Sequence, residues 1–282
     1  MSIEDPSDLI KRVTASTLKA IAGVQDEEVN ITYSSAPPSI NGLDIKMPNP
    51  EPILGKKEIE NYRGLSDSLG VRLRYHNEMV HKKYMPSGKD AQAVYETIEQ
   101  ARCESLGSNH LIGVANNLSA ILDEKCQKKG YNDISEKVDS MLPDVIGFLV
   151  REQLTGKKPP KNAQKLVNLW RNDIKTQIGD QLKNLCNVAH DQENFADFSI
   201  QIIRELELID DTSDKLDQEN DETNENDETH NDEADNDKPQ TGEDNESASL
   251  GGDTEGGEES GISDSSEDDL TSTSGDEEPA GP

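Results

Sequence analysis

The stretch AQAVYETIEQARCESLG, residues 91–107, decides the fold class. Its apolar side chains recur every three or four residues, which is the spacing of an α-helix with one buried face. Gly107 suits the end of such a helix, because glycine adopts the left-handed backbone conformation at little cost. The stripe consists of Ala91, Val94, Tyr95, Ile98 and Ala101, continued by Arg102.

The same period continues on both sides of this stretch, from residue 55 almost to residue 209. Pro143 lies inside one of the stripes and predicts a kink or a restart there, because proline cannot donate the helical hydrogen bond. We therefore expect residues 55–209 to form a helical bundle. The other stripes cover residues 59–73, 79–80, 111–122, 138–149, 166–185 and 195–209.

Residues 1–54 predict a smaller unit ahead of the bundle. Asp5 and Pro6 are typical of a helix start. Residues 29–33 alternate with period two, as in a strand, and residues 40–45 predict a second short strand with an Asn-Gly turn signal inside it. We expect a small N-terminal helix–hairpin appendage on a mainly α protein.

Residues 210–282 differ in composition from everything before them. They hold 28 of the 58 acidic residues and only two of the 28 basic ones, a net charge of about −26, and no aromatic residue. Too little apolar surface is available there to offset the entropy lost on ordering the backbone, so we expect a disordered acidic low-complexity tail. Its charge repels nucleic acid and anionic membranes, and we expect neither as a partner.

The sequence contains no complete phosphate-binding loop and no convincing metal-binding pair. Residues 155–158 contain a Gly-Lys pair but lack the rest of a phosphate-binding loop. His76 and His81 lie five apart, roughly 140° around a helix, and make a poor metal pair. His110 and His190 are expected at helix starts, in solvated or capping roles. We expect no catalytic, cofactor or metal-binding residue in this chain.

Polar residues on the helical stripes have a structural interpretation. Glu96, Glu99 and Glu104 fit the solvated face of their helix, while Cys103 and Trp170 fit the core. The three cysteines, which include Cys126 and Cys186, form no C-x-x-C pair. They are typical of free thiols in a reducing cytoplasm, where we expect the protein to be located.

One basic stretch, residues 63–83, suggests a functional hypothesis. In a chain this acidic, it could contact an acidic partner or the protein's own tail, although a charged helix face and its turn are the simpler explanation. The candidate partner-binding residues are Arg63, Arg72, Arg74, His76, Lys82 and Lys83.

Five segments, read in order, resemble the CobT family, a subunit of the aerobic ATP-dependent cobaltochelatase. Residues 63–76 are similar to its R-G-x-x-D-x-x-x-x-R-L-R-x-H pattern, and residues 94–107 to V-[FY]-x-x-[VI]-E-Q-A-R-x-E-x-L-G. The remaining three are residues 113–118 (GVANNL), 151–156 (REQLTG) and 168–171 (NLWR).

The resemblance implies a non-catalytic adaptor between a AAA+ motor, similar to CobS, and the large chelatase subunit, similar to CobN. The complex would be oligomeric and would use ATP and Mg²⁺ to insert Co²⁺ into hydrogenobyrinic acid a,c-diamide. The family continues into a von Willebrand A-type domain with a D-x-S-x-S loop. That domain is absent from these residues, so we expect part of a larger or split subunit, or a truncated product. The alternative hypothesis is a protein that shields basic partners with its acidic tail.

Overall fold

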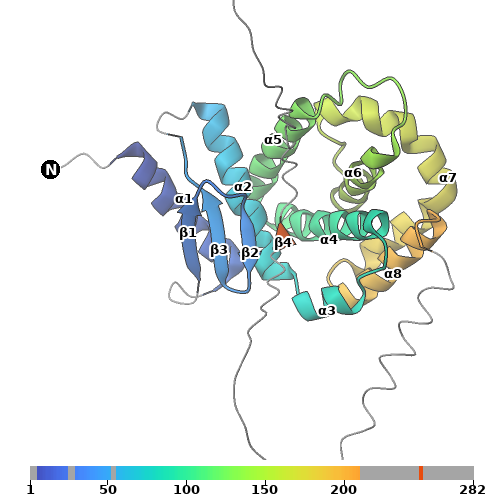
Figure 1. Ribbon diagram of the computed structural model, residues 1–282, viewed down its shortest axis with the longest axis horizontal. Helices are drawn as coiled ribbons and strands as arrows, with labels where there is room; N and C mark the ends of the chain where they lie inside the picture. Colours follow the sequence, from blue (N-terminus) through green and yellow to red (C-terminus); the bar gives the residue numbers. More distant parts are fainter. Residues whose placement is uncertain (1–4, 25–28, 52–54, 210–247, 250–282) are drawn as a thin grey trace, which may run out of the picture. The chain divides into compact units, whose positions relative to one another are not determined.

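The computed structural model describes residues 5–24, 29–51, 55–209 and 248–249 (Figure 1). The described part is built mainly from helices with one small sheet, which confirms the predicted mainly α class. The predicted disordered tail, residues 210–282, lies outside the described residues except for residues 248–249. None of the described helices is both long enough and apolar enough to cross a lipid bilayer.

The first helix, α1 (Pro6–Ala22), has the start that its sequence predicts. The Asp5 side chain accepts a hydrogen bond from the Ser7 backbone N–H at 2.8 Å, and a proline lies in the first turn. Gly23 ends the helix with a φ of 72°. This left-handed conformation is strained for residues with a side chain, so glycine is the natural residue there.

Strands β1 (Asn30–Ser34), β2 (Ser39–Asn41) and β3 (Asp44–Pro48) follow α1. Strands β2 and β3 form an antiparallel hairpin, whereas β1 pairs with β3 in parallel. The expectation of one strand over residues 40–45 is wrong, because the Asn-Gly pair reverses the chain between two strands. The strand order is β1-β3-β2-β4, where the two-residue β4 (Ala248–Ser249) pairs with the free edge of β2.

Helix α2 (Lys56–Tyr75) joins the small sheet to the helical bundle. One of its sides packs on α1 and the sheet through buried residues that include Leu69 of α2, Leu18 of α1 and Ile45 of β3. Its other sides contact α5 (Ile112–Lys128) and α4 (Lys89–His110). These approaches are close, because a Cβ atom on Gly64 would lie 2.5 Å from the Asn117 carbonyl oxygen of α5.

Helix α4 lies in the middle of the helical part (Figure 1). It contacts α2, α5, α6 (Leu142–Thr155) and α8 (Gln192–Glu205), so residues 101–107 are buried on every side of the helix. Gly107 does not end α4 as predicted. It lies inside the helix, where a Cβ atom would stand 2.3 Å from Val71 Cγ1, and it permits close packing of α4 on α2.

The remaining helices close the bundle. A short helix α3 (Glu78–Lys83) connects α2 to α4, and α7 (Gln164–Val188) contacts both α6 and α8. Pro143 lies in the first turn of α6, directly after the 3-10 turn η1 (Asp139–Met141), so the predicted restart is confirmed. A second 3-10 turn, η2 (Lys161–Ala163), precedes α7.

Candidate functional site

A buried ion pair lies where α2, α4 and α7 meet. Arg102 of α4, with only 2% of its surface exposed, donates from Nε and Nη2 to the two carboxylate oxygens of Glu99, both at 2.8 Å. Its Nη2 also donates to the Tyr75 carbonyl at 2.6 Å, and its Nη1 donates to the Ala189 carbonyl at 3.1 Å. One guanidinium thus holds the ends of α2 and α7 against the middle of α4.

His76 completes this centre. Its Nδ1 lies 2.8 Å from Glu99 Oε1, and its Nε2 lies 3.0 Å from Glu78 Oε2. Burial by itself would raise the pKa of Glu99, but the hydrogen bonds from Arg102 and His76 outweigh it and lower the pKa to about 2. Glu99 is therefore a carboxylate at neutral pH, stabilised from two sides.

A second polar group extends the centre along α4. His81 Nε2 lies 2.7 Å from Glu96 Oε1, and the His81 ring stacks on Tyr95 with 4.7 Å between the ring centroids. Arg72 donates to Glu96 at 3.3 Å and to Gln100 at 3.0 Å. Burial raises the pKa of Glu96, but the contacts with His81 and Arg72 outweigh burial and bring the pKa below its ordinary value.

Glu104 forms a third buried group, one turn further along α4. It accepts hydrogen bonds from Ser68 at 2.7 Å, from Gln100 at 2.9 Å, and from Arg151 at 2.6 and 3.0 Å. Burial raises the pKa of Glu104, and its partners, Arg151 above all, bring it below the ordinary value. The carboxylate thus fastens α4 to both α2 and α6.

The prediction that Glu96, Glu99 and Glu104 lie on a solvated face is wrong for two of the three. Glu99 and Glu104 are buried, and Glu96 is half-buried. The reason is that α4 has neighbours on all sides, so its polar face meets basic side chains of α4 itself and of other helices instead of water. Cys103 does lie in the core as predicted, with no exposed surface, and burial raises the pKa of its thiol.

The six candidate partner-binding residues do not share one surface. Arg72 is buried, and His76 shows only 7% of its side chain, both within the polar centre. Arg63, Arg74, Lys82 and Lys83 are exposed. Arg74 donates to the Ile21 carbonyl, Lys82 lies 3.5 Å from Glu78, and Lys83 lies 2.6 Å from Glu193.

Three possible metal donors lie close together in the buried centre. The ligand atoms of His76, Glu99 and Cys103 are within 4.8 Å of one another. However, Arg102 already binds both Glu99 oxygens, and its Nη2 lies 3.9 Å from Cys103 Sγ. A fixed cation at this place opposes a second one, and the protonated thiol is a poor ligand. We interpret the cluster as a structural ion pair.

His110 and His190 were expected at helix starts, and this is wrong. His110 is the last residue of α4, and His190 follows the end of α7. Their rings lie 6.3 Å apart between centroids.

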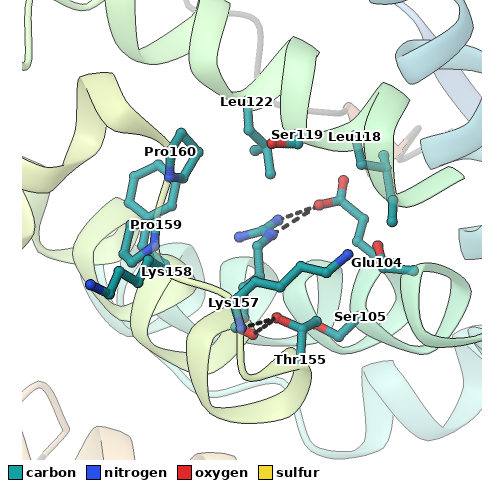
Figure 2. A pocket seen from close by; sticks show the side chains of 14 residues that line it. Glu104, Ser105, Leu118, Ser119, Leu122, Thr155, Lys157, Lys158, Pro159 and Pro160 are labelled. Atoms are coloured by element: carbon teal, nitrogen blue, oxygen red, sulfur yellow. Dashed lines mark hydrogen bonds and ion pairs between the residues drawn. The ribbon is translucent and has the colours of Figure 1, made fainter. Parts of the chain in front are cut away.

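A pocket of about 70 Å³ lies between α4, α5, α6 and the loop that follows α6 (Figure 2). Its walls are largely apolar, and the ion pair of Glu104 with Arg151 lies at one side. Figure 2 shows Lys157 extending over the pocket, whereas Lys158 points away from it. The other lining residues are Ser105, Ser108, Ala115, Leu118, Ser119, Leu122, Phe148, Thr155, Pro159 and Pro160.

Sequence reasoning missed this pocket, although one signal was present. Residues 157–165 contain four lysines and no acidic residue, in a domain with slightly more acids than bases. The predicted partner-binding residues instead came from the basic stretch at residues 63–83, because histidines and arginines accompany its lysines. The structure shows that part of that stretch binds glutamates of α4.

Fold and site together define a mainly helical protein in which buried glutamates of α4 bind arginine side chains. The family model described as "Cobalamin biosynthesis protein CobT" matches residues 4–280. The chain therefore belongs to the CobT family, as its sequence segments indicate, and takes part in cobalamin biosynthesis. No solved structure matches the chain.

Proposed function

We propose that this chain is a non-catalytic subunit of the ATP-dependent cobaltochelatase of aerobic cobalamin biosynthesis. In this reaction Co²⁺ is inserted into hydrogenobyrinic acid a,c-diamide. The observation that carries the proposal is the family match over residues 4–280, because it covers the whole described domain together with the acidic residues that follow it.

The state of the buried carboxylates supports a scaffold role. A general acid or base must reach a substrate from a cleft. Glu99 and Glu104 instead bind Arg102 and Arg151 inside the protein. Their contribution is to fix the relative positions of α2, α4, α6 and α7, which is the rigidity that a coupling subunit needs.

In this proposal the chain is an adaptor between a AAA+ motor similar to CobS and a large chelatase subunit similar to CobN. ATP and Mg²⁺ belong to the motor, Co²⁺ is the substrate of the complex, and this chain binds no cofactor. The complex works in the cytoplasm and involves neither nucleic acid nor a membrane.

The test is cobalt insertion by purified motor and large subunits, followed through the absorption change of the corrinoid, with and without this polypeptide. We expect insertion only when all three are present, and co-elution of the chain with the motor in size-exclusion chromatography. Equal insertion rates without this chain would refute the proposal.

The alternative, a protein that shields basic partners, rests on the charge of about −26 in residues 210–282. It predicts binding to an unrelated basic protein as tight as binding to the motor. A competition experiment between lysozyme and the motor subunit therefore separates the two functions. Displacement of the motor by equimolar lysozyme would favour the alternative.

A further inference from the structure

The pocket between α4, α5 and α6 has the size and walls of a site for one aliphatic side chain. Its volume of about 70 Å³ exceeds what a single water molecule needs and is about half that of a roughly 150 Å³ cavity that binds benzene. The carbon atoms of one leucine or isoleucine side chain occupy a similar space, whereas an indole ring is larger. The apolar walls include Leu118, Leu122, Phe148 and Pro159, which favour a hydrocarbon group over water.

The pocket also contains a polar atom that lacks a partner. Ser105 is only 2% exposed, and its hydroxyl oxygen has no hydrogen-bond partner in the part of the chain that the structure describes. Buried hydroxyl groups nearly always have a partner, because losing water without replacement costs free energy. Figure 2 shows Ser105 beside Glu104 and Thr155 at the pocket.

Positive charge surrounds the pocket. Residues 151–165 contain five basic residues and one acidic residue, while residues 1–209 contain 26 basic and 30 acidic residues. Lys157 and Lys158 are exposed and form no ion pair with any side chain that the structure describes. The carboxylate of Glu104 is already neutralised by Arg151, so the surface around the opening favours an anionic ligand.

We propose that this pocket binds an acidic peptide segment of a partner protein. One aliphatic side chain of that segment enters the cavity, and flanking carboxylates lie against Lys157 and Lys158. Three of the family-like segments, residues 94–107, 113–118 and 151–156, meet at this pocket, which links it to the part of the sequence that defines the family. The proposal concerns the binding surface and holds whatever reaction the partner takes part in.

The direct test is fluorescence anisotropy of the full chain with the labelled peptide Glu-Asp-Asp-Leu-Asp-Glu at about physiological ionic strength. We expect saturable binding that weakens at least tenfold when leucine is replaced by serine or by tryptophan, and no saturable binding of hexaglutamate. Equal binding of the leucine, serine and hexaglutamate peptides would reduce the site to a general anion surface and overturn the proposal.

Variants locate the peptide on the protein. The exposed pair Lys157→Glu/Lys158→Glu is expected to weaken binding at least tenfold. The matched control Lys89→Glu/Lys175→Glu makes the same change in net charge at exposed lysines outside the pocket and is expected to weaken binding less than twofold.

Ser119→Phe tests the cavity separately, because Ser119 is exposed at the pocket and a large ring there blocks it without altering the core. We expect at least a tenfold loss of affinity with an unchanged melting temperature. Equal losses from both lysine pairs, or full affinity of a folded S119F, would overturn the proposal.

Discussion

Arg102 is the side chain whose removal should cost this fold most. Its guanidinium satisfies four acceptors: both oxygens of Glu99 and the carbonyls of Tyr75 and Ala189. Arg102→Met keeps much of the side-chain volume but leaves a buried carboxylate with His76 as its main remaining partner. Removing one member of a buried ion pair costs about 3–5 kcal/mol. In a domain of this size each kcal/mol shifts the melting temperature by about 2–4 °C, so the expected loss is roughly 6–20 °C.

The measurement is urea denaturation followed by circular dichroism at pH 7, on the single variants and on Arg102→Met/Glu99→Gln. Because the double variant no longer contains the unpaired charge, it should be less destabilised than the sum of the single effects by about 1–3 kcal/mol. The control is Lys83→Met, which removes an exposed ion pair to Glu193 and should leave the midpoint unchanged within error. An Arg102→Met cost below about 1 kcal/mol, with additive single effects, would refute the ion-pair interpretation.

Three further predictions follow from other parts of the structure. The pKa of Glu99 is lowered to about 2 from an ordinary 4.5, so its ionised form contributes about 3 kcal/mol to the free energy of unfolding. This contribution is complete above pH 4.5 and is lost as the pH falls toward 2. Glu99→Gln should therefore flatten the pH dependence of the free energy of unfolding between these pH values, and an unchanged slope would contradict the assignment. Gly107→Ala should destabilise the fold by about 1–3 kcal/mol, because the new methyl group meets Val71. The control Gly113→Ala places its methyl group where nothing lies within 4 Å, so it should be neutral or stabilising by up to about 1 kcal/mol. Similar melting temperatures for both variants would count against the close α2–α4 packing. Cys186 is exposed while Cys103 and Cys126 are buried, so a thiol reagent should modify one cysteine rapidly in the native protein and three after denaturation, and fast modification of Cys103 would show that the core opens.

Local sequence signals predicted the elements well wherever one residue type decides the backbone. Asp5 and Pro6 begin α1, and Pro143 lies in the first turn of α6. Gly107 misled the prediction, because the same residue type serves two purposes. Glycine ends helices by adopting a positive φ, and it also allows two helices to approach within a helix interior. Only the position of Val71, far away in sequence, distinguishes the two uses.

The glutamates of α4 were misjudged for a related reason. A helix with one apolar stripe is expected to expose its other face, and this holds when only one side has neighbours. Helix α4 is covered by α2, α5, α6 and α8, so Glu99 and Glu104 are buried and need basic partners. Those partners come partly from other helices: His76 follows α2, and Arg151 belongs to α6. Spacing along one helix carries no information on such partners.

The sequence by itself determined the helical class, the start of α1 and the membership in the CobT family, because periodicity, caps and sequence motifs are local properties of the chain. Tertiary structure alone decided that Arg72 and His76 bind glutamates of α4, and that Lys157 and Lys158 lie beside a pocket with an unpartnered hydroxyl. Burial and pairing depend on which helices become neighbours. That choice is made by the packing of the whole domain, so it cannot be read from any single segment.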